Sequence, residues 1–523
     1  MKKIYLLVSM AAFLLMGGIT GCDDGSLLHE DVYIPDPVED SDEDDGYSAE
    51  PTTESVFRVQ PGEGHRHQLI DGFGCSFGWM EAVYRNTKRE EIMDELYGDA
   101  GLRFNIYRGE ICPSSLSSDG SYSFCLDENF NLPADSHEVS QLGWFDFNGI
   151  WAGKQKQYAQ MWLVNYLSRR NYKDIYYFFS VWTPPAVWKS FGSDGDPNGH
   201  FNSEYSVEFA RYLASFAKAY KERFGINVYG ISGWNEPDQA MGGWAGCGWG
   251  LEQMADFTHD YLRPELNRQG CEDTWIIYGE CPWWANAVAW MKNTLAYKPE
   301  VADDKIVAAG HGYSTVASNI LPMTEVEEKG VHVWQTETCD DKTRDETWND
   351  AMKWAENYHG YLINARANAI VWWAGARHCT TTGENLLQLE QYDISHTYYR
   401  VDRFYSIGQF SRYIQRGSRR VDVQKVSTSA NRIPNDLTAS AYIKDDTYTI
   451  VLVNNSKTRS VQALVEMEDK EFETMVSYTS SASVKWLRKK LNPSLSGKRS
   501  VTVPKHSVVT ITGRFRDKSP TVE

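Results

Sequence analysis

Two glutamates, each closing a strand-like run, are the residues of this chain whose type and position could do chemistry. Glu236 closes the run 228–236, and Glu337 lies at the end of the run 331–338. Both runs begin with β-branched and aromatic residues and turn polar directly after the glutamate. A glycosidase needs two such carboxyl groups, one to protonate the leaving oxygen and one to attack or to activate water. Because Trp234, Asn235 and Trp334 lie beside these glutamates, we predict a sugar-cleaving enzyme rather than two solvated loop residues.

The elements that must position this pair follow a repeated pattern. Helical stretches separate most of the strand-like runs, and 206–225, which ends in a glycine, is the clearest of them. A run of eight β/α units predicts an α/β fold with a (β/α)8 TIM barrel, here over 71–405. The eight runs are 71–77, 101–108, 174–182, 228–236, 275–280, 305–313, 331–338 and 368–375.

In such a barrel the functional groups lie at the C-terminal ends of the strands. Glu236 ends the fourth run and Glu337 the seventh, so we expect the two to meet across the barrel mouth. The alternative fold is a doubly wound open sheet, but no glycine-rich phosphate loop follows any of the strands. We predict no cofactor.

The pattern of alternating strands and helices ends at about residue 406, and short strand-like segments follow. The segment 441–456 has the pattern of two strands around an Asp-Asp turn, and 501–512 that of another strand. Short alternating strands without helices between them predict a smaller β-sandwich over 406–515. The segment 56–70 is also strand-like, and we expect it to supply N-terminal strands to the same sandwich.

The N-terminus has the pattern of an export signal. Lys2 and Lys3 precede the apolar stretch 5–19, and Gly21-Cys22 resembles a bacterial lipobox. We predict a lipoprotein signal peptide over 1–22, with Cys22 lipidated. An uncleaved transmembrane anchor would need about 20 apolar residues, and the stretch 5–19 is shorter than that. We therefore expect an exported monomer, lipid-anchored to the bacterial outer membrane or cell surface.

An acidic segment follows the signal peptide. Thirteen acidic residues and no lysine or arginine occur from 23 to 54, so we predict a disordered linker over 23–55. The net charge of the chain is −19, and the linker carries most of it. The rest is only mildly acidic and shows no basic patch, which excludes nucleic acid as a partner.

Cysteine spacing argues against a metal site. Eight cysteines follow Cys22, and none of them forms a CxxC or Cys/His cluster with zinc spacing. We expect no metal. An exported chain can form disulfides, and Cys112 with Cys125 is the favoured local pair.

Several motifs, taken in order, resemble glycoside hydrolase family 30 over roughly residues 56 to 515. That family belongs to a retaining clan, clan A, whose barrels carry the acid/base on strand four and the nucleophile on strand seven. The motifs are GFG in the first run, SVWTPPAVWKS (180–190), WNEPD (234–238), HGY (311–313), WQTE (334–337) and FYSIGQFSRYIQRGSRRV (404–421).

The resemblance implies a role for each matching residue. Glu236 would be the acid/base and Glu337 the nucleophile. Asn235 would bind the 2-hydroxyl of the sugar, and Arg103 would be the arginine that braces the nucleophile. His311 and Tyr313 would contact the nucleophile or the −1 sugar. Trp182 and Trp373 would form two walls of that subsite.

Two of these assignments have rivals. Arg108 lies five residues after Arg103 in the same run and could be the bracing arginine. Trp372 and Trp373 point to opposite faces of one strand, so one faces the barrel interior and the other the helices. Trp373 is preferred because it lies nearer the C-terminal end.

The substrate is a carbohydrate under this hypothesis. The HGY motif and the overall sequence pattern resemble the endo-β-1,6-galactanase-like branch, so we predict cleavage of β-1,6-galactan or a similar glycan. Cleavage of β-xylan, glucuronoxylan, β-1,6-glucan or glucosylceramide is the alternative. A non-catalytic glycan-binding lipoprotein would keep loop tryptophans but not both glutamates. Those tryptophans are Trp79, Trp244, Trp249, Trp283 and Trp284.

Overall fold

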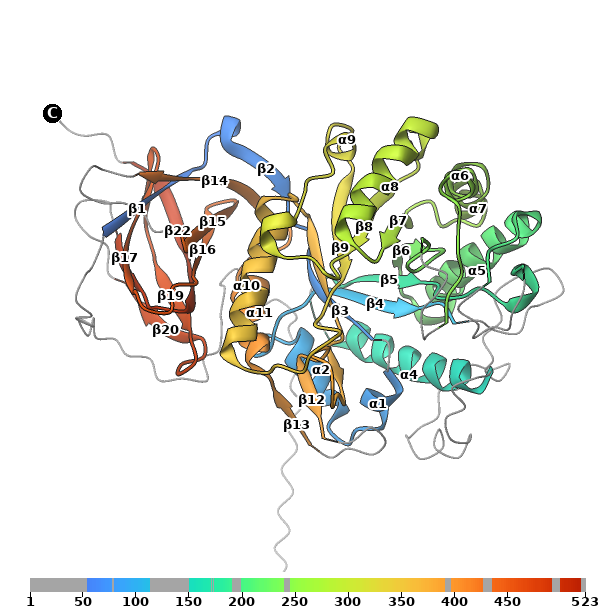
Figure 1. Ribbon diagram of the computed structural model, residues 1–523, viewed down its shortest axis with the longest axis horizontal. Helices are drawn as coiled ribbons and strands as arrows, with labels where there is room; N and C mark the ends of the chain where they lie inside the picture. Colours follow the sequence, from blue (N-terminus) through green and yellow to red (C-terminus); the bar gives the residue numbers. More distant parts are fainter. Residues whose placement is uncertain are drawn as a thin grey trace, which may run out of the picture. The chain divides into compact units, whose positions relative to one another are not determined.

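The computed structural model describes residues 54–77, 80–112, 150–170, 172, 174–190, 199–238, 245–390, 397–426, 435–491 and 499–518. Eight parallel strands close into a barrel (Figure 1), in the order β10-β3-β4-β5-β6-β7-β8-β9. The (β/α)8 fold predicted from the sequence is therefore confirmed. The strands are β3 (Gly72–Ser76), β4 (Ile106–Glu110), β5 (Tyr176–Ser180), β6 (Val228–Ser232), β7 (Trp275–Cys281), β8 (Ile306–His311), β9 (His332–Glu337) and β10 (Ala369–Trp373).

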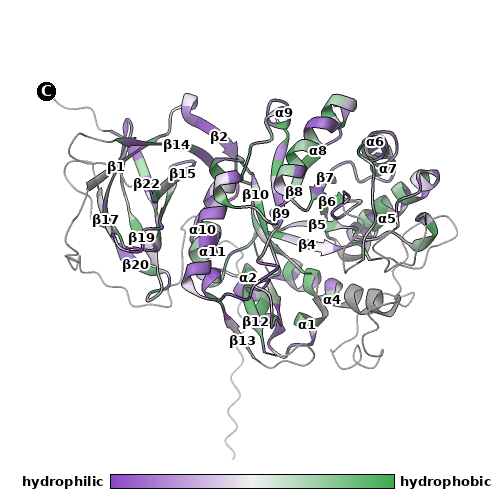
Figure 2. Ribbon diagram, in the orientation of Figure 1, coloured by the Kyte–Doolittle hydropathy of each residue, from purple (hydrophilic) through white to green (hydrophobic). Residues whose placement is uncertain are grey.

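Helices follow the strands of the barrel, and in Figure 2 they carry both hydrophilic and hydrophobic residues. Such amphipathic helices bury one side against the strands. Gly225 ends α5 in the left-handed conformation, at φ 66°, which glycine adopts without a steric penalty. The helices are α1 (Met80–Arg85), α2 (Arg89–Tyr97), α4 (Ile150–Arg169), α5 (Ser206–Phe224), α6 (Leu251–Asp256), α7 (Arg263–Arg268), α8 (Trp284–Tyr297), α9 (Thr324–Glu327), α10 (Trp348–Ile363) and α11 (Asp402–Ser411).

Apolar side chains fill the barrel interior as a separate cluster. Phe178 and Trp334 meet there edge to face, with ring centroids 5.7 Å apart. This packing fills the barrel interior between its two ends, and the functional groups of such barrels lie at the C-terminal ends of the strands. The interior cluster comprises Ile106, Phe178, Ile277, Val307, Ala309, Trp334, Ala369 and Val371.

The second domain is an 11-stranded sheet with its own apolar core. Its first strand, β1 (Glu54–Gln60), pairs antiparallel with β14 (Arg419–Val426) and parallel with β17 (Val461–Met467). The strand thus begins inside the segment predicted as linker. The other strands are β2 (Arg66–Leu69), β15 (Leu437–Lys444), β16 (Thr447–Asn454), β18 (Lys470–Phe472), β19 (Val476–Ser480), β20 (Leu487–Lys490), β21 (Arg499–Val503) and β22 (Ser507–Asp517); β11 (Ala376–Arg377), β12 (Leu387–Leu389) and β13 (Tyr398–Arg400) form a separate three-stranded sheet.

Helix α11 joins the two domains through close contacts. Trp486 donates its indole N–H to the Tyr405 carbonyl oxygen at 2.9 Å, and Thr510 donates to the Gln409 carbonyl oxygen at 2.7 Å. Gly408 lies so close to Trp486 that a Cβ there would approach the indole to 2.3 Å. The boundary predicted at 405/406 therefore falls inside a helix that packs on the sheet domain.

Candidate active site

The arginine beside Glu337 is Arg108, and the prediction of Arg103 is wrong. Arg108 lies within β4, is fully buried, and donates from Nη1 to Glu337 Oε2. Arg103 precedes the strand at φ 54°, pairs with Asp99 at 3.2 Å and donates to the Arg412 carbonyl oxygen. The error arises because β4 begins at Ile106, so the front of the predicted run is a turn before the strand.

Both oxygens of Glu337 are held by buried or half-buried donors. Oε2 accepts from Arg108, and Oε1 accepts from the Tyr313 hydroxyl at 2.6 Å. Burial raises the pKa of Tyr313 well above its usual range, so its hydroxyl keeps the proton that it donates. Donors to both oxygens stabilise the ionised form of this carboxyl group.

Glu236 occupies a different environment. It lies four residues beyond the end of β6, is 5% exposed, and has a positive φ of 52°. Its Oε1 lies 3.1 Å from His311 Nδ1. Burial raises the pKa of Glu236, although the hydrogen bond with His311 opposes the shift. Glu236 is therefore suited to hold a proton, while Glu337 is held as an anion.

His311 lies at the centre of the cluster and is fully buried. Its Nδ1 lies 3.8 Å from Glu337 Oε1, in addition to the contact with Glu236. Burial alone would lower the pKa of His311, but the surrounding glutamates raise it to about 9. The imidazole is thus a cation at neutral pH.

A third glutamate, Glu280, completes the cluster and was not predicted as a site residue. It is fully buried at the end of β7, with Oε1 3.1 Å from Arg108 Nη2 and 3.8 Å from His311 Nε2. Burial would raise the pKa of Glu280, but the charge of Arg108, together with His311 and Ser232, outweighs this effect and lowers the pKa to about 2. The signal was present in the sequence, since Glu280 closes the fifth strand-like run.

Asn235 and two tryptophans border the carboxyl pair. Asn235 accepts a 2.7 Å hydrogen bond at Oδ1 from Arg108 Nη2, which fixes the orientation of its amide. The rings of Trp182 and Trp373 lie 5.8 Å apart, and the Arg108 guanidinium lies 4.7 Å from the Trp182 ring centroid. Trp372 packs edge to face on Trp354 of α10 at 4.6 Å, so it faces the helices.

The spacing of the two carboxyl groups indicates which displacement they can support. An oxygen of Glu236, an oxygen of Glu337 and a nitrogen of His311 all lie within 4.8 Å of one another. Retaining glycosidases hold their carboxyl groups about 5–5.5 Å apart, and inverting ones about 6.5–9.5 Å. The same three residues could in principle ligate a metal ion, but Arg108 and Tyr313 already occupy both oxygens of Glu337.

No family model matches the chain, but individual proteins are similar to it. It is 25% identical over 315 residues to a glucuronoxylanase of Bacillus subtilis, covering 58% of this chain and 66% of that enzyme. It is 23% identical over 376 residues to an endo-1,6-β-D-glucanase of Neurospora crassa, covering 68% and 72% of the two chains. The chain thus spans just under two thirds of the glucuronoxylanase.

Among solved structures, the family 30 subfamily 8 xylanase of Clostridium acetobutylicum superimposes with a TM-score of 0.64 at 22% identity. The superposition covers 88% of this chain and 99% of the xylanase. The similar structures include several family 30 glycoside hydrolases, and the similar sequences are those of a glucuronoxylanase, an endo-1,6-β-D-glucanase and glucosylceramidases. The family resemblance predicted from the sequence is confirmed at this level. The galactanase-like branch remains a prediction.

The loop tryptophans of this protein have different environments. Trp249 and Trp284 are buried, and Trp284 donates to the Leu321 carbonyl oxygen, so both belong to the core. Trp283 is 41% exposed, directly after the strand that carries Glu280. The side chains of Trp79 and Trp244, like Cys22 and Cys125, lie outside the described residues.

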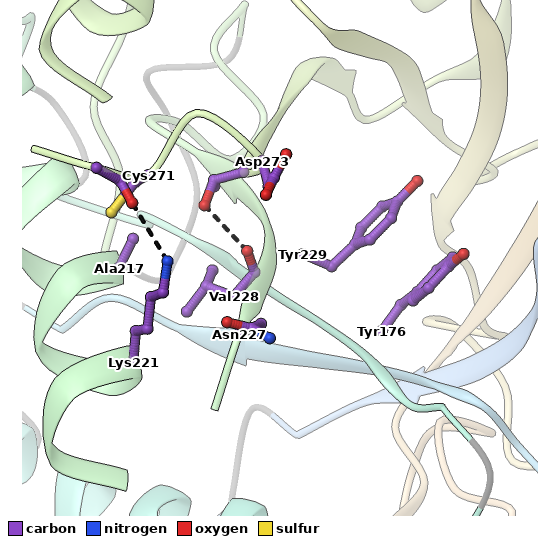
Figure 3. Close-up of a pocket in the computed structure, with 10 residues that line it drawn as sticks. Tyr176, Ala217, Lys221, Asn227, Val228, Tyr229, Cys271 and Asp273 are labelled. Carbon is purple, nitrogen blue, oxygen red and sulfur yellow. Dashed lines mark hydrogen bonds between the residues drawn. The ribbon is translucent and has the colours of Figure 1, made fainter. Parts of the chain in front are cut away.

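A cavity of about 440 Å³ lies away from the glutamates. Figure 3 shows it lined by Lys221 of α5 and by Tyr176 and Tyr229, whose parallel rings lie 3.8 Å apart. Tyr176 and Val228 begin β5 and β6, so the cavity belongs to the N-terminal end of the barrel. Active sites of TIM barrels lie at the other end, and this cavity is not the candidate active site.

Proposed function

We propose that the protein is a retaining O-glycoside hydrolase that cleaves β-linked polysaccharide by double displacement. The observation that supports this most strongly is the contrast between two carboxyl groups within 4.8 Å. The Glu337 carboxyl group is held by Arg108 and Tyr313, whereas burial raises the pKa of the Glu236 carboxyl group.

In the first step the Glu337 carboxylate attacks the anomeric carbon while Glu236 gives its proton to the departing oxygen. The products are a glycosyl ester on Glu337 and a free leaving group, with Glu236 now ionised. In the second step Glu236 takes a proton from water, whose oxygen attacks the same carbon and releases Glu337. Two inversions give net retention.

The remaining side chains support these steps. Asn235, whose Oδ1 is fixed by Arg108, can donate from Nδ2 to the 2-hydroxyl of the −1 sugar. Trp182 and Trp373 can form the apolar walls of that subsite. No step calls for a metal ion or an organic cofactor.

For the substrate we propose β-1,6-galactan or a similar neutral glycan, on the sequence resemblance given above. A uronic acid side chain would need a cation to bind its carboxylate. Arg377, just after β10, forms an ion pair with Glu384, and Arg108 is engaged by Glu337. Within the described residues these two arginines are already matched, which supports an uncharged sugar over glucuronoxylan.

A panel of polysaccharides read by product chromatography tests the substrate. It contains β-1,6-galactan, arabinogalactan side chains, β-1,6-glucan and glucuronoxylan. Galactan and β-1,6-glucan differ only in the configuration of the 4-hydroxyl, so their comparison reports on contacts at that position. Cleavage of glucuronoxylan alone would reject the neutral-glycan proposal, and inactivity on every polymer would reject the hydrolase proposal.

Trp283 is the exposed aromatic side chain best placed to extend the binding site. The Tyr313 backbone N–H donates to the Pro282 carbonyl oxygen at 3.2 Å, so Trp283 adjoins the loop that carries Tyr313. Exposed aromatic rings stack on the apolar faces of sugars. We expect Trp283→Ala to raise KM for polymer several-fold without changing kinetics on an aryl monoglycoside. Equal effects on both substrates would remove Trp283 from a distal subsite.

We also propose that the chain is exported, lipid-anchored through Cys22 to the outer membrane or cell surface, and monomeric. The pattern of residues 1–22 supports export and anchoring. Within the described residues, no helix has the length and apolarity needed to cross a membrane. Cys22→Ala should move the protein from the membrane fraction to the soluble fraction. Membrane retention of that variant would contradict lipid anchoring, and sedimentation velocity tests the monomer.

A further inference from the structure

Glu280 is a buried ionisable group at the barrel mouth that the double displacement does not use. Its two carboxylate oxygens accept no hydrogen bond of good geometry within the described part of the chain. Two cations lie beside them, Arg108 at 3.1 Å and His311 at 3.8 Å, and interactions with His311 and Ser232 also lower the pKa of this carboxyl group. A buried carboxylate in this setting is costly unless cations match it.

The backbone at Glu280 is specialised for this placement. The register between β7 and β8 shifts between Gly279 and Cys281, so Glu280 is the extra residue of a β-bulge. It has a positive φ of 53°, which is uncommon for a residue other than glycine. Bulges and left-handed residues of this kind gather at functional sites, where they redirect a side chain.

Glu280 also contacts the acid/base through its main chain. The backbone N–H of Glu236 donates to the Glu280 carbonyl oxygen at 3.1 Å. Substituting the Glu280 side chain keeps this bond. The effect of the carboxylate charge can therefore be measured separately from the effect of the loop geometry.

The charges of the cluster balance only when Glu280 is counted. Arg108 and His311 are two cations, and Glu280 with Glu337 are two anions, so Glu236 can remain neutral. Three further titratable groups of the described chain that face the cluster are neutral at physiological pH, because burial raises the pKa of each well above its usual range. These groups are Tyr313, Cys281 and Cys339.

We propose that Glu280 is a positioning residue whose fixed negative charge keeps both Arg108 and His311 cationic while Glu236 retains the proton needed for catalysis. The proposal rests on the double displacement proposed above. Without Glu280, two cations would face a single anion. The cluster would then release one proton near neutral pH, either from His311 or from Glu236.

The test compares four variants of the full-length protein. Glu280→Gln and Glu280→Met remove the charge, the second as an alternative if the glutamine variant does not fold. Glu280→Asp keeps the charge. Asp71→Asn is the matched control, because Asp71 is a buried carboxylate that contacts His332 and Trp334 at 2.7 Å at the opposite end of the barrel.

The first measurement needs no substrate. NMR titration of labelled histidine rings and glutamate carboxyl groups follows the protons of His311 and Glu236 directly. The signals are assigned with the variants His311→Gln and Glu236→Gln. We expect removal of the Glu280 charge to lower the titration midpoint of His311 or Glu236 by about 1–3 pH units. The two other variants, Glu280→Asp and Asp71→Asn, should leave both midpoints near the wild-type values.

The second measurement is the pH dependence of kcat/KM on an aryl β-glycoside that the wild-type protein hydrolyses. If His311 or Glu236 loses its proton at a lower pH, the activity falls at a lower pH. We therefore expect the basic limb of the profile to shift toward acidic pH in Glu280→Gln but not in Glu280→Asp. Unchanged midpoints in Glu280→Gln or Glu280→Met, or an equal shift in Asp71→Asn, would overturn the proposal. A wild-type protein inactive on every glycoside would instead reject the hydrolase function, and the NMR titration would still decide on Glu280.

Discussion

Three buried glutamates lie at the barrel mouth, and each has different neighbours. Two of them could be predicted from the sequence, since a strand-like run that ends in glutamate beside tryptophan indicates a carboxyl group at the barrel mouth. Glu280 ends such a run too, but a two-carboxylate mechanism assigns it no role. Its contacts with Arg108 and His311 join strands far apart in the sequence, and only the folded barrel brings them together.

Removal of the proposed nucleophile should abolish turnover. Glu337→Ala deletes the carboxylate that forms the glycosyl ester, so we expect kcat to fall by at least about 10³-fold. Azide should restore part of the rate on an activated aryl glycoside, giving a glycosyl azide of inverted configuration. Thermal melting checks that the variant is folded. A variant that keeps a tenth of the wild-type rate would show that Glu337 is not the nucleophile.

Removal of the acid/base should depend on the leaving group. Glu236→Gln should slow substrates with poor leaving groups by about 10²–10⁴-fold and activated aryl glycosides far less, because only the former need protonation. Glu236 must hold its proton, so wild-type activity should fall as pH rises through its raised pKa. That basic limb should weaken in the variant. Equal losses on both classes of substrate would exclude Glu236 from this role.

Elements were predicted more reliably than their exact ends. Periodicity located all eight barrel strands and helix α5, because apolar spacing reports directly which side of an element is buried. The start of β4 was missed because Leu102 and Phe104 are also buried, which prolongs the strand-like pattern into the preceding turn. Because the strand was predicted to begin a few residues too early, the role of Arg108 was assigned to Arg103.

The register of β4 leads to a test with paired substitutions. Arg108→Lys should lower kcat/KM by about 10²-fold or more, because one ammonium group cannot replace a guanidinium that contacts Glu337, Glu280 and Asn235 together. Arg103→Lys, a matched change five residues earlier, should leave kcat/KM within about twofold, as it does not contact the cluster. Steady-state kinetics at several pH values measures both. A larger loss from Arg103→Lys would contradict the observed register.

At the scale of the whole molecule, the sheet domain takes strands from both ends of the described chain. The sequence predicted that 56–70 supplies strands to this domain, but it did not predict which strands they pair with, because pairing over such distances leaves no local signal. Trp348 donates to the His506 carbonyl oxygen at 2.7 Å, and Asn455 donates to Glu356 at the same distance. Several such bonds fix α10 and α11 of the barrel against the sheet.

Truncation after residue 410 should therefore give an insoluble or unfolded product. It removes both partners of β1 and exposes the side of α11 that contacts Trp486. Expression of 54–410, assayed by size-exclusion chromatography and circular dichroism, measures the outcome. Deletion of 23–53 is the matched control and should leave kinetics and melting temperature unchanged. A soluble, active 54–410 fragment would show that the barrel folds alone.

The pairing of β1 also bears on how the protein is made. Arg58 of β1 contacts Glu466 of β17 across 408 residues of sequence. A ribosome adds about 5–20 residues per second, so the first strand waits roughly 20–80 s for that neighbour to be synthesised. During this time an apolar strand containing Phe57 and Val59 has neither partner, and such edges invite pairing with other chains. The yield of soluble protein should thus respond to chaperones and to growth temperature more strongly than the stability of the finished fold would indicate.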